Sequence, residues 1–199
     1  MRLLYSLGVV YVGLCAALVW RGRPAPTPLS PVPSRPIVPA RAPHTGPVLS
    51  GPEWFQQMKP FCNPVEVETR VQWQPPPETF DGTAYGAGCF ALAGKIARAR
   101  GLLETLSGGE RAQAANIVFE LAHPVADAGD DQSAGPIMGL VVEFSPRNYM
   151  ALYHAGASEF ALGQGDLART HLRQFLELYQ SADGWRSNAI SMLDKLGAR

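Results

Sequence analysis

The helical periodicity of the segment from Tyr149 to Gln180 constrains the fold of this chain most strongly. In its second half, apolar residues recur at the spacing of one helix face, and they are Ala168, Leu172, Phe175, Leu176 and Tyr179. The first half has a similar spacing, at Leu152, Ala155, Gly156 and Phe160. The run Gly163 to Asp166 separates the two halves, so the segment predicts an antiparallel pair of helices joined by a tight turn.

Earlier stretches carry weaker versions of the same pattern. In residues 83–106, Ala99 and Leu103 stand as Ala168 and Leu172 do, and the two alanines are 69 residues apart, close to two periods of 34. Two amphipathic runs lie between them. The first opens on the capping-box pattern Ser107 to Glu110, and the second has Pro136 in its expected first turn. These runs predict a middle helix pair.

The segment 149–181 resembles a tetratricopeptide repeat, of the kind found in membrane-anchored bacterial proteins. The residues that carry the resemblance are Leu152, Ala155-Gly156, Ala168 and Leu172. With the weaker stretches, the resemblance implies an all-α domain over 82–199, a short solenoid of about three helical hairpins. A capping helix is expected behind Asp183, with Trp185, Ala189, Met192, Leu193 and Leu196 on one face.

The resemblance also implies a function, because such repeats bind extended or helical peptides on a concave surface. On the clearest repeat this peptide-binding surface is expected to include Tyr153, Ala157 and Phe160. The partner is then a protein, and the chain an adaptor or scaffold of the cell envelope. Lys+Arg and Asp+Glu balance at 17 each, so the charge gives no reason to expect nucleic acid as a partner.

The N-terminus is expected to enter a membrane. Residues 3–20 form an uncharged apolar run of 18, about 27 Å long as a helix and close to the hydrocarbon thickness of a bilayer. Arg2, Arg21 and Arg23 flank it. We expect a signal anchor over 1–23, hence a single-pass membrane protein; the alternative is a cleaved signal peptide and a secreted domain.

A spacer and an irregular segment are expected next. Ten of the 18 prolines fall in 24–52, which predicts a disordered linker. The segment 53–81 is expected to be irregular and to pack on the domain. Its aromatic residues offer an alternative for the concave surface, because they are able to fill it in place of a partner; they are Trp54, Phe55, Phe61, Trp73 and Phe80.

Cys62 and Cys89 are the two cysteines outside the apolar run. In an extracytoplasmic, periplasmic domain they predict a disulfide that closes a loop of about 28 residues and contributes about 3 to 4 kcal/mol. The alternative is a pair of buried thiols in the cytoplasm.

We expect neither a cofactor nor an enzyme. No C-x-x-C is present, the histidines are scattered at 44, 123, 154 and 171, and no nucleophile elbow or H-E-x-x-H motif occurs. The alternative centres on a loop expected at 123–135, which contains His123, Asp127, Asp130 and Asp131. That loop is a candidate metal site of an enzyme or sensor, or else a solvated connection whose aspartates cap helices.

Overall fold

The computed structural model describes residues 49–197, and this part of the chain is all-α. The predicted membrane span at 1–23 and nearly all of the linker 24–52 lie outside it. Within 49–197, no helix is both long and apolar enough to cross a bilayer. The helices are α2 (Gly51–Met58), the short 3-10 helix η1 (Lys59–Phe61), α3 (Val67–Trp73), α4 (Phe80–Leu92), α5 (Ile96–Glu104), α6 (Gly108–Asp127), α7 (Asp131–Phe144), α8 (Tyr149–Ala161), α9 (Gly165–Leu178) and α10 (Gly184–Gly197).

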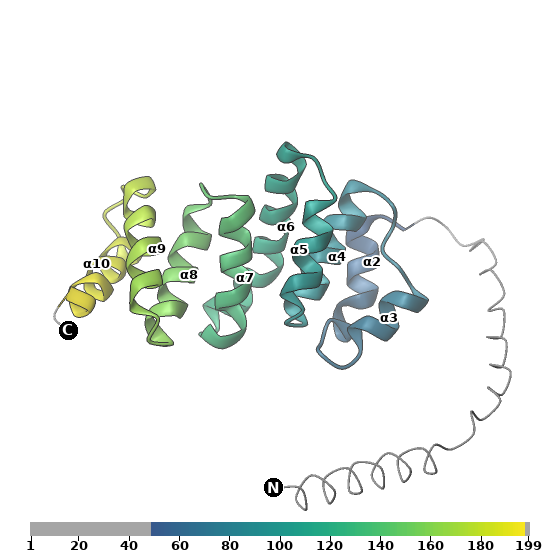
Figure 1. The fold of residues 1–199 in the computed structure, drawn as a ribbon, viewed down its shortest axis with the longest axis horizontal. Coiled ribbons are helices and arrows are strands. Elements are labelled where there is room, and N and C mark those ends of the chain that lie inside the picture. The colour runs from purple at the N-terminus through teal and green to yellow at the C-terminus, as the bar shows by residue number, and fades with distance from the viewer. Residues whose placement is uncertain (1–48, 198–199) are drawn as a thin grey trace, which may run out of the picture. The chain divides into compact units, whose positions relative to one another are not determined.

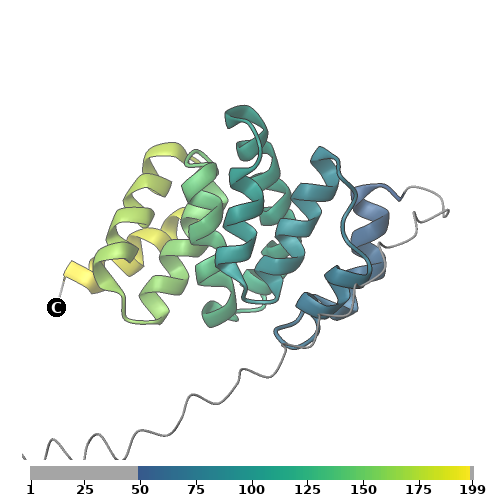
Figure 2. The same ribbon diagram turned by 45° about the vertical axis from the view of Figure 1, so that its right-hand side comes forward.

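The helices pack sequentially. Within the unit Gly46–Arg199 they follow one another in chain order, from α2 and α3 at one end to α10 at the other (Figure 1). The turned view in Figure 2 keeps this order. Three successive helix pairs form hairpins, namely α4 with α5, α6 with α7, and α8 with α9. The helix pair predicted at 149–181 and the predicted middle pair are confirmed.

The three hairpins share one register, set at their turns. Gly94, Gly129 and Gly163 have positive φ angles of 70°, 75° and 76° and lie 35 and 34 residues apart. This left-handed conformation ends one helix and reverses the chain, and glycine adopts it without steric cost. Five residues after each glycine stands a fully buried alanine, and nine residues after it a fully buried larger side chain. The alanines are Ala99, Ala134 and Ala168, and the larger residues are Leu103, Met138 and Leu172.

Close approach within the last hairpin explains why a glycine stands in its first helix. A Cβ added at Gly156 of α8 would lie 2.7 Å from Cγ of Leu172 in α9, nearer than packed carbon atoms come. Ala87 in α4 and Ala122 in α6 precede their buried alanines by the same twelve residues, and both are fully buried. Small residues at this position let each pair of helices meet closely.

The segment 53–81 is not irregular as expected, because most of it lies in α2, η1 and α3. Helix α2 begins at Gly51, inside the predicted linker, and Pro52 lies in its first turn, where the missing amide hydrogen costs nothing. A capping box closes this end, with the Ser50 amide donating to Glu53 Oε2 at 2.8 Å. Buried side chains of α2, Trp54 among them, place it against α4.

The loop expected at 123–135 is also absent, since α6 runs to Asp127 and α7 begins at Asp131. Pro124 lies inside α6, and Pro136 lies inside α7 rather than in its first turn. Each proline removes one helix hydrogen bond, yet both helices continue because their buried faces remain packed against their neighbours. Neither proline therefore marks the end or the first turn of a helix.

Three smaller expectations are confirmed. Cys62 and Cys89 form a disulfide, with Cα atoms 4.9 Å apart, that ties the segment after η1 to α4. Ser107 and Glu110 form the predicted capping box at the start of α6. Asp183 accepts a hydrogen bond from the amide of Arg186 at 3.2 Å and so caps α10.

Candidate functional site

Three side chains from two helices meet where the second and third hairpins adjoin. His123 and Asp127 stand one turn apart on α6, and His154 comes from α8. The two histidine Nε2 atoms are 3.0 Å apart. Asp127 Oδ1 lies 3.5 Å from Nε2 of His123 and 3.7 Å from Nε2 of His154. Among the described residues, these three form a group of potential metal ligands whose ligand atoms all lie within 4.8 Å of one another.

Aromatic packing fixes both imidazole rings. Phe119 stacks on His123 with the ring centroids 4.7 Å apart. Tyr153 and Trp185 lie edge-on to His154, at centroid distances of 5.3 Å and 5.7 Å. Because of this packing, His154 is buried while Asp127 remains exposed at the rim.

The pKa of His154 is lowered from 6.5 to about 4, chiefly because burial disfavours the charged imidazolium. The neighbouring His123 lowers this pKa further, whereas the carboxylates of Asp127 and Asp131 raise it and only partly offset the burial. His154 is therefore neutral at pH 7. A neutral imidazole keeps one nitrogen lone pair, which is available to accept a hydrogen bond or to bind a metal ion.

Of the four residues of the predicted metal alternative, the structure brings His123 and Asp127 together and gives the other two separate contacts. Asp130 caps α7 by accepting from the Ser133 amide at 3.2 Å. Asp131 accepts a hydrogen bond from Ser158 Oγ at 2.9 Å. His154, which sequence reasoning did not place in this group, is 31 residues from His123. No local pattern signals that pairing, because it depends on how α8 stacks against the second hairpin.

The three residues predicted to line a concave peptide-binding surface, Tyr153, Ala157 and Phe160, are buried or half-buried. Tyr153 is only 7% exposed, and its ring lies edge-on to Phe175 and Trp185, at centroid distances of 5.2 and 4.9 Å. Ala157 and Phe160 are half-buried. Helix α10 packs against both α8 and α9, and its Trp185 helps to cover Tyr153. The segment 53–81, which was the alternative candidate to fill the concave surface, instead packs its helix α2 against α4.

A groove remains open between α6, the first helix of the second hairpin, and the connection from α7 into the start of α8. Its volume is about 520 Å³, and aromatic, charged and amide side chains are among those that line it. Among its lining residues, Asn116 Oδ1 accepts hydrogen bonds from Ser145 Oγ and Asn148 Nδ2, both at 3.0 Å, which ties α6 to the start of α8. The lining residues are Asn116, Phe119, Glu120, Ser145, Arg147, Asn148, Tyr149 and Met150.

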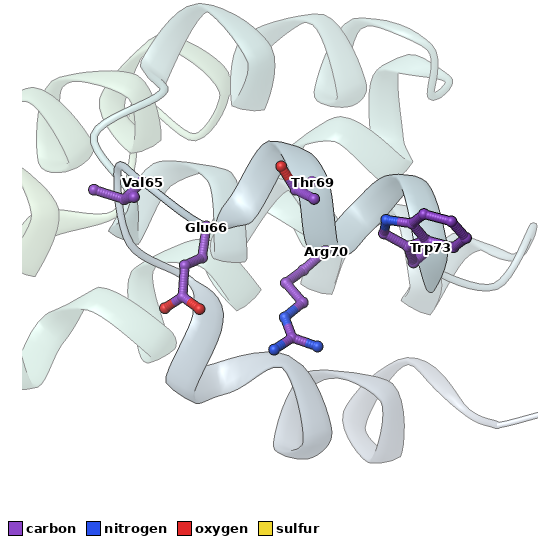
Figure 3. Close-up of a pocket in the computed structure, with 5 residues that line it drawn as sticks. All are labelled: Val65, Glu66, Thr69, Arg70 and Trp73. Atoms are coloured by element: carbon purple, nitrogen blue, oxygen red, sulfur yellow. The ribbon is translucent and has the colours of Figure 1, made fainter.

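A second exposed surface lies on α3 and on the residues just before it. Val65 and Trp73 are 86% and 72% exposed, unusually high fractions for large apolar residues. These two residues and Glu66, Thr69 and Arg70 line a pocket of about 380 Å³. In Figure 3, Glu66 and Arg70 project to the same side of the helix. The Arg70 guanidinium lies over the ring of Phe61 at 3.9 Å, which holds α3 against η1.

Comparisons of the chain with protein-family models, with curated proteins and with solved structures found no match.

Proposed function

We propose that this domain is a protein-interaction module of the cell envelope, an adaptor or scaffold rather than an enzyme, held to a membrane by residues 3–20. The groove between α6 and the start of α8 carries the proposal. It combines the exposed aromatic ring of Tyr149 with the opposite charges of Glu120 and Arg147, a mixture typical of surfaces that bind peptides.

The common register of the hairpins supports a tetratricopeptide-like architecture. The intervals of 35 and 34 residues between Gly94, Gly129 and Gly163 match the period of 34 of that repeat. Buried small residues in both helices of each hairpin are also what such stacking requires. In this architecture the first helices of neighbouring hairpins line the binding surface, and α6 and α8 hold those places.

The disulfide supports an extracytoplasmic, periplasmic location. Disulfides persist in oxidising compartments and are rare where glutathione keeps thiols reduced. The Cys62–Cys89 bond joins two segments of the folded core, so it is of the structural kind. With residues 3–20 as a single-pass anchor and 24–48 as a spacer, the domain is presented away from the membrane surface.

Site-specific photocrosslinking tests the proposal. A photoreactive phenylalanine analogue replaces Tyr149 in the groove, Trp73 on α3 or Leu167 on the outer face of α9, in the full-length protein in its native cell. Tyr149 and Leu167 are similarly exposed, at 42% and 53%, so they form a matched pair. We expect one discrete crosslinked protein from position 149 and none from 167. Arg147→Glu should reduce that product several-fold.

Crosslinking of the same proteins from positions 149 and 167 would indicate random contact and contradict a specific groove. A discrete product from position 73 alone would move the binding surface to α3 and show that the groove proposal is wrong. Absence of any product from all three positions would count against an interaction role altogether.

A further inference from the structure

We propose that His123, Asp127 and His154 bind one divalent transition-metal ion of the Zn²⁺ class, which links α6 to α8. This site does not depend on the adaptor role, because it rests on the geometry of three ligand atoms.

The spacing of the three atoms matches metal coordination. Their separations are 3.0, 3.5 and 3.7 Å. A point equidistant from three atoms so placed lies about 2.0 Å from each, and Zn–N and Zn–O bonds measure about 2.0 to 2.2 Å. The side chains therefore need almost no movement to coordinate an ion.

A plain hydrogen bond between the histidines explains only part of this arrangement. One Nε2–H donating to the other Nε2 accounts for the separation of 3.0 Å. Asp127 Oδ1, however, stands beyond hydrogen-bond distance of both rings yet nearly equidistant from them. A cation between the three atoms accounts for all three positions at once.

The donor types select the class of metal. Two imidazole nitrogens and one carboxylate oxygen suit Zn²⁺ and its neighbours, whereas Mg²⁺ and Ca²⁺ prefer sites made of oxygen ligands. The charges agree, because the Asp127 carboxylate belongs to the site and Asp131 adds a second carboxylate close enough to act on His154. With three protein ligands, a tetrahedral ion keeps one position, which water reaches past the exposed Asp127.

The rings are also held in place before any ion binds. Phe119 stacks on His123, while Tyr153 and Trp185 enclose His154, so neither ring has to be ordered on binding. Packing of this kind around ligands limits the loss of side-chain freedom and raises affinity.

Calorimetric titration of ZnCl₂ into the full-length protein, purified in detergent and stripped with EDTA, tests the site. We expect one ion per chain. His154→Gln should abolish this binding, and Asp127→Asn should weaken it at least about tenfold. His171→Gln is the matched control, because His171 pairs with Glu159 at 2.8 Å outside this cluster; it should still bind one ion. With Co²⁺ in place of Zn²⁺, visible absorption bands should appear in the wild type and be lost in Asp127→Asn.

Asp127 is exposed, so its variant is expected to keep the thermal unfolding midpoint of the metal-free wild type, which separates lost binding from lost folding. Equal Zn²⁺ affinity in the wild type and Asp127→Asn would overturn the proposal. So would the absence of binding to the wild type, which would leave a direct hydrogen bond between the two histidines as the full account.

Discussion

The two ends of the helical stack are built on the same plan and held by different forces. At the N-terminal end, α2 lies on the first hairpin, with the apolar side chains of Trp54 and Phe55 buried, and a disulfide adds a covalent link. At the C-terminal end, α10 lies on the last hairpin, but there the interior includes the polar residues His154 and Ser158. Small residues set the helix contacts at both ends.

This difference predicts different sensitivities. The N-terminal end depends on apolar burial and on a bond that only a reductant breaks. The C-terminal end depends on an imidazole that must stay neutral and on aromatic rings packed around it. We therefore expect the stability of the N-terminal end to depend on redox conditions and that of the C-terminal end to depend on pH.

The largest expected effect comes from removing the covalent link. The double variant Cys62→Ala and Cys89→Ala should lose about 3 to 4 kcal/mol of unfolding free energy, because the unfolded chain is no longer constrained by the loop. Urea unfolding in the absence of reductant measures this loss, and reduction of the wild type should reproduce it. A loss below about 1 kcal/mol would mean that apolar burial alone holds the N-terminal end.

At the C-terminal end, lowering the pH should reduce stability through the protonation of His154. The folded-state pKa of His154, about 4, lies below its unfolded value of 6.5, so the unfolded state takes up a proton first. The stability that neutral His154 contributes is complete above pH 6.5 and is lost as the pH falls toward 4. The full effect is on the order of 3 kcal/mol. Burial is the main cause of the lowered pKa of His154; His123 lowers it further, and Asp127 and Asp131 partly offset both.

Urea unfolding in EDTA at pH 7 and pH 4.5, for the wild type and for His154→Gln, isolates this contribution from the other groups that titrate in acid. The stability difference between the two proteins should shrink at the lower pH. A difference that is the same at both pH values would show that burial of His154 has no electrostatic cost.

A smaller effect is expected from changing the glycine turns that the three hairpins have in common. Replacing Gly94, Gly129 or Gly163 with alanine should cost about 1 kcal/mol each, because alanine is strained at positive φ although each site has open space. Gly101→Ala is the matched control inside α5, with space but no positive φ, and should stabilise by up to about 1 kcal/mol. Thermal unfolding of the four variants measures these shifts. Unequal costs among the three turns would contradict their equivalence.

Much of the stack follows from local patterns in the sequence. Helical spacing predicted α8 and α9, the capping box placed the start of α6, and cysteine counting paired Cys62 with Cys89. The short helices α2 and α3 were missed because proline-rich surroundings hid a pattern of only seven or eight residues.

The candidate site could be predicted only in part. His123 and Asp127 share a helix face one turn apart, which is visible in the sequence. His154 joins them through the stacking of α8 beside α6, and Tyr153 is covered because α10 turns back. Both facts depend on contacts between helices, which no local spacing encodes.

Hydrogen exchange measured by mass spectrometry on the full-length protein tests the contrast between the two ends most directly. Reduction of the disulfide should speed exchange, relative to the oxidised protein, in α2 and α4 and leave α8 to α10 nearly unchanged. Zn²⁺ should slow exchange in α6 and α8 and leave α2 and α3 nearly unchanged. Equal changes in the same peptides under both treatments would contradict the account, because the two ends would then be held as one cooperative unit by the same contacts.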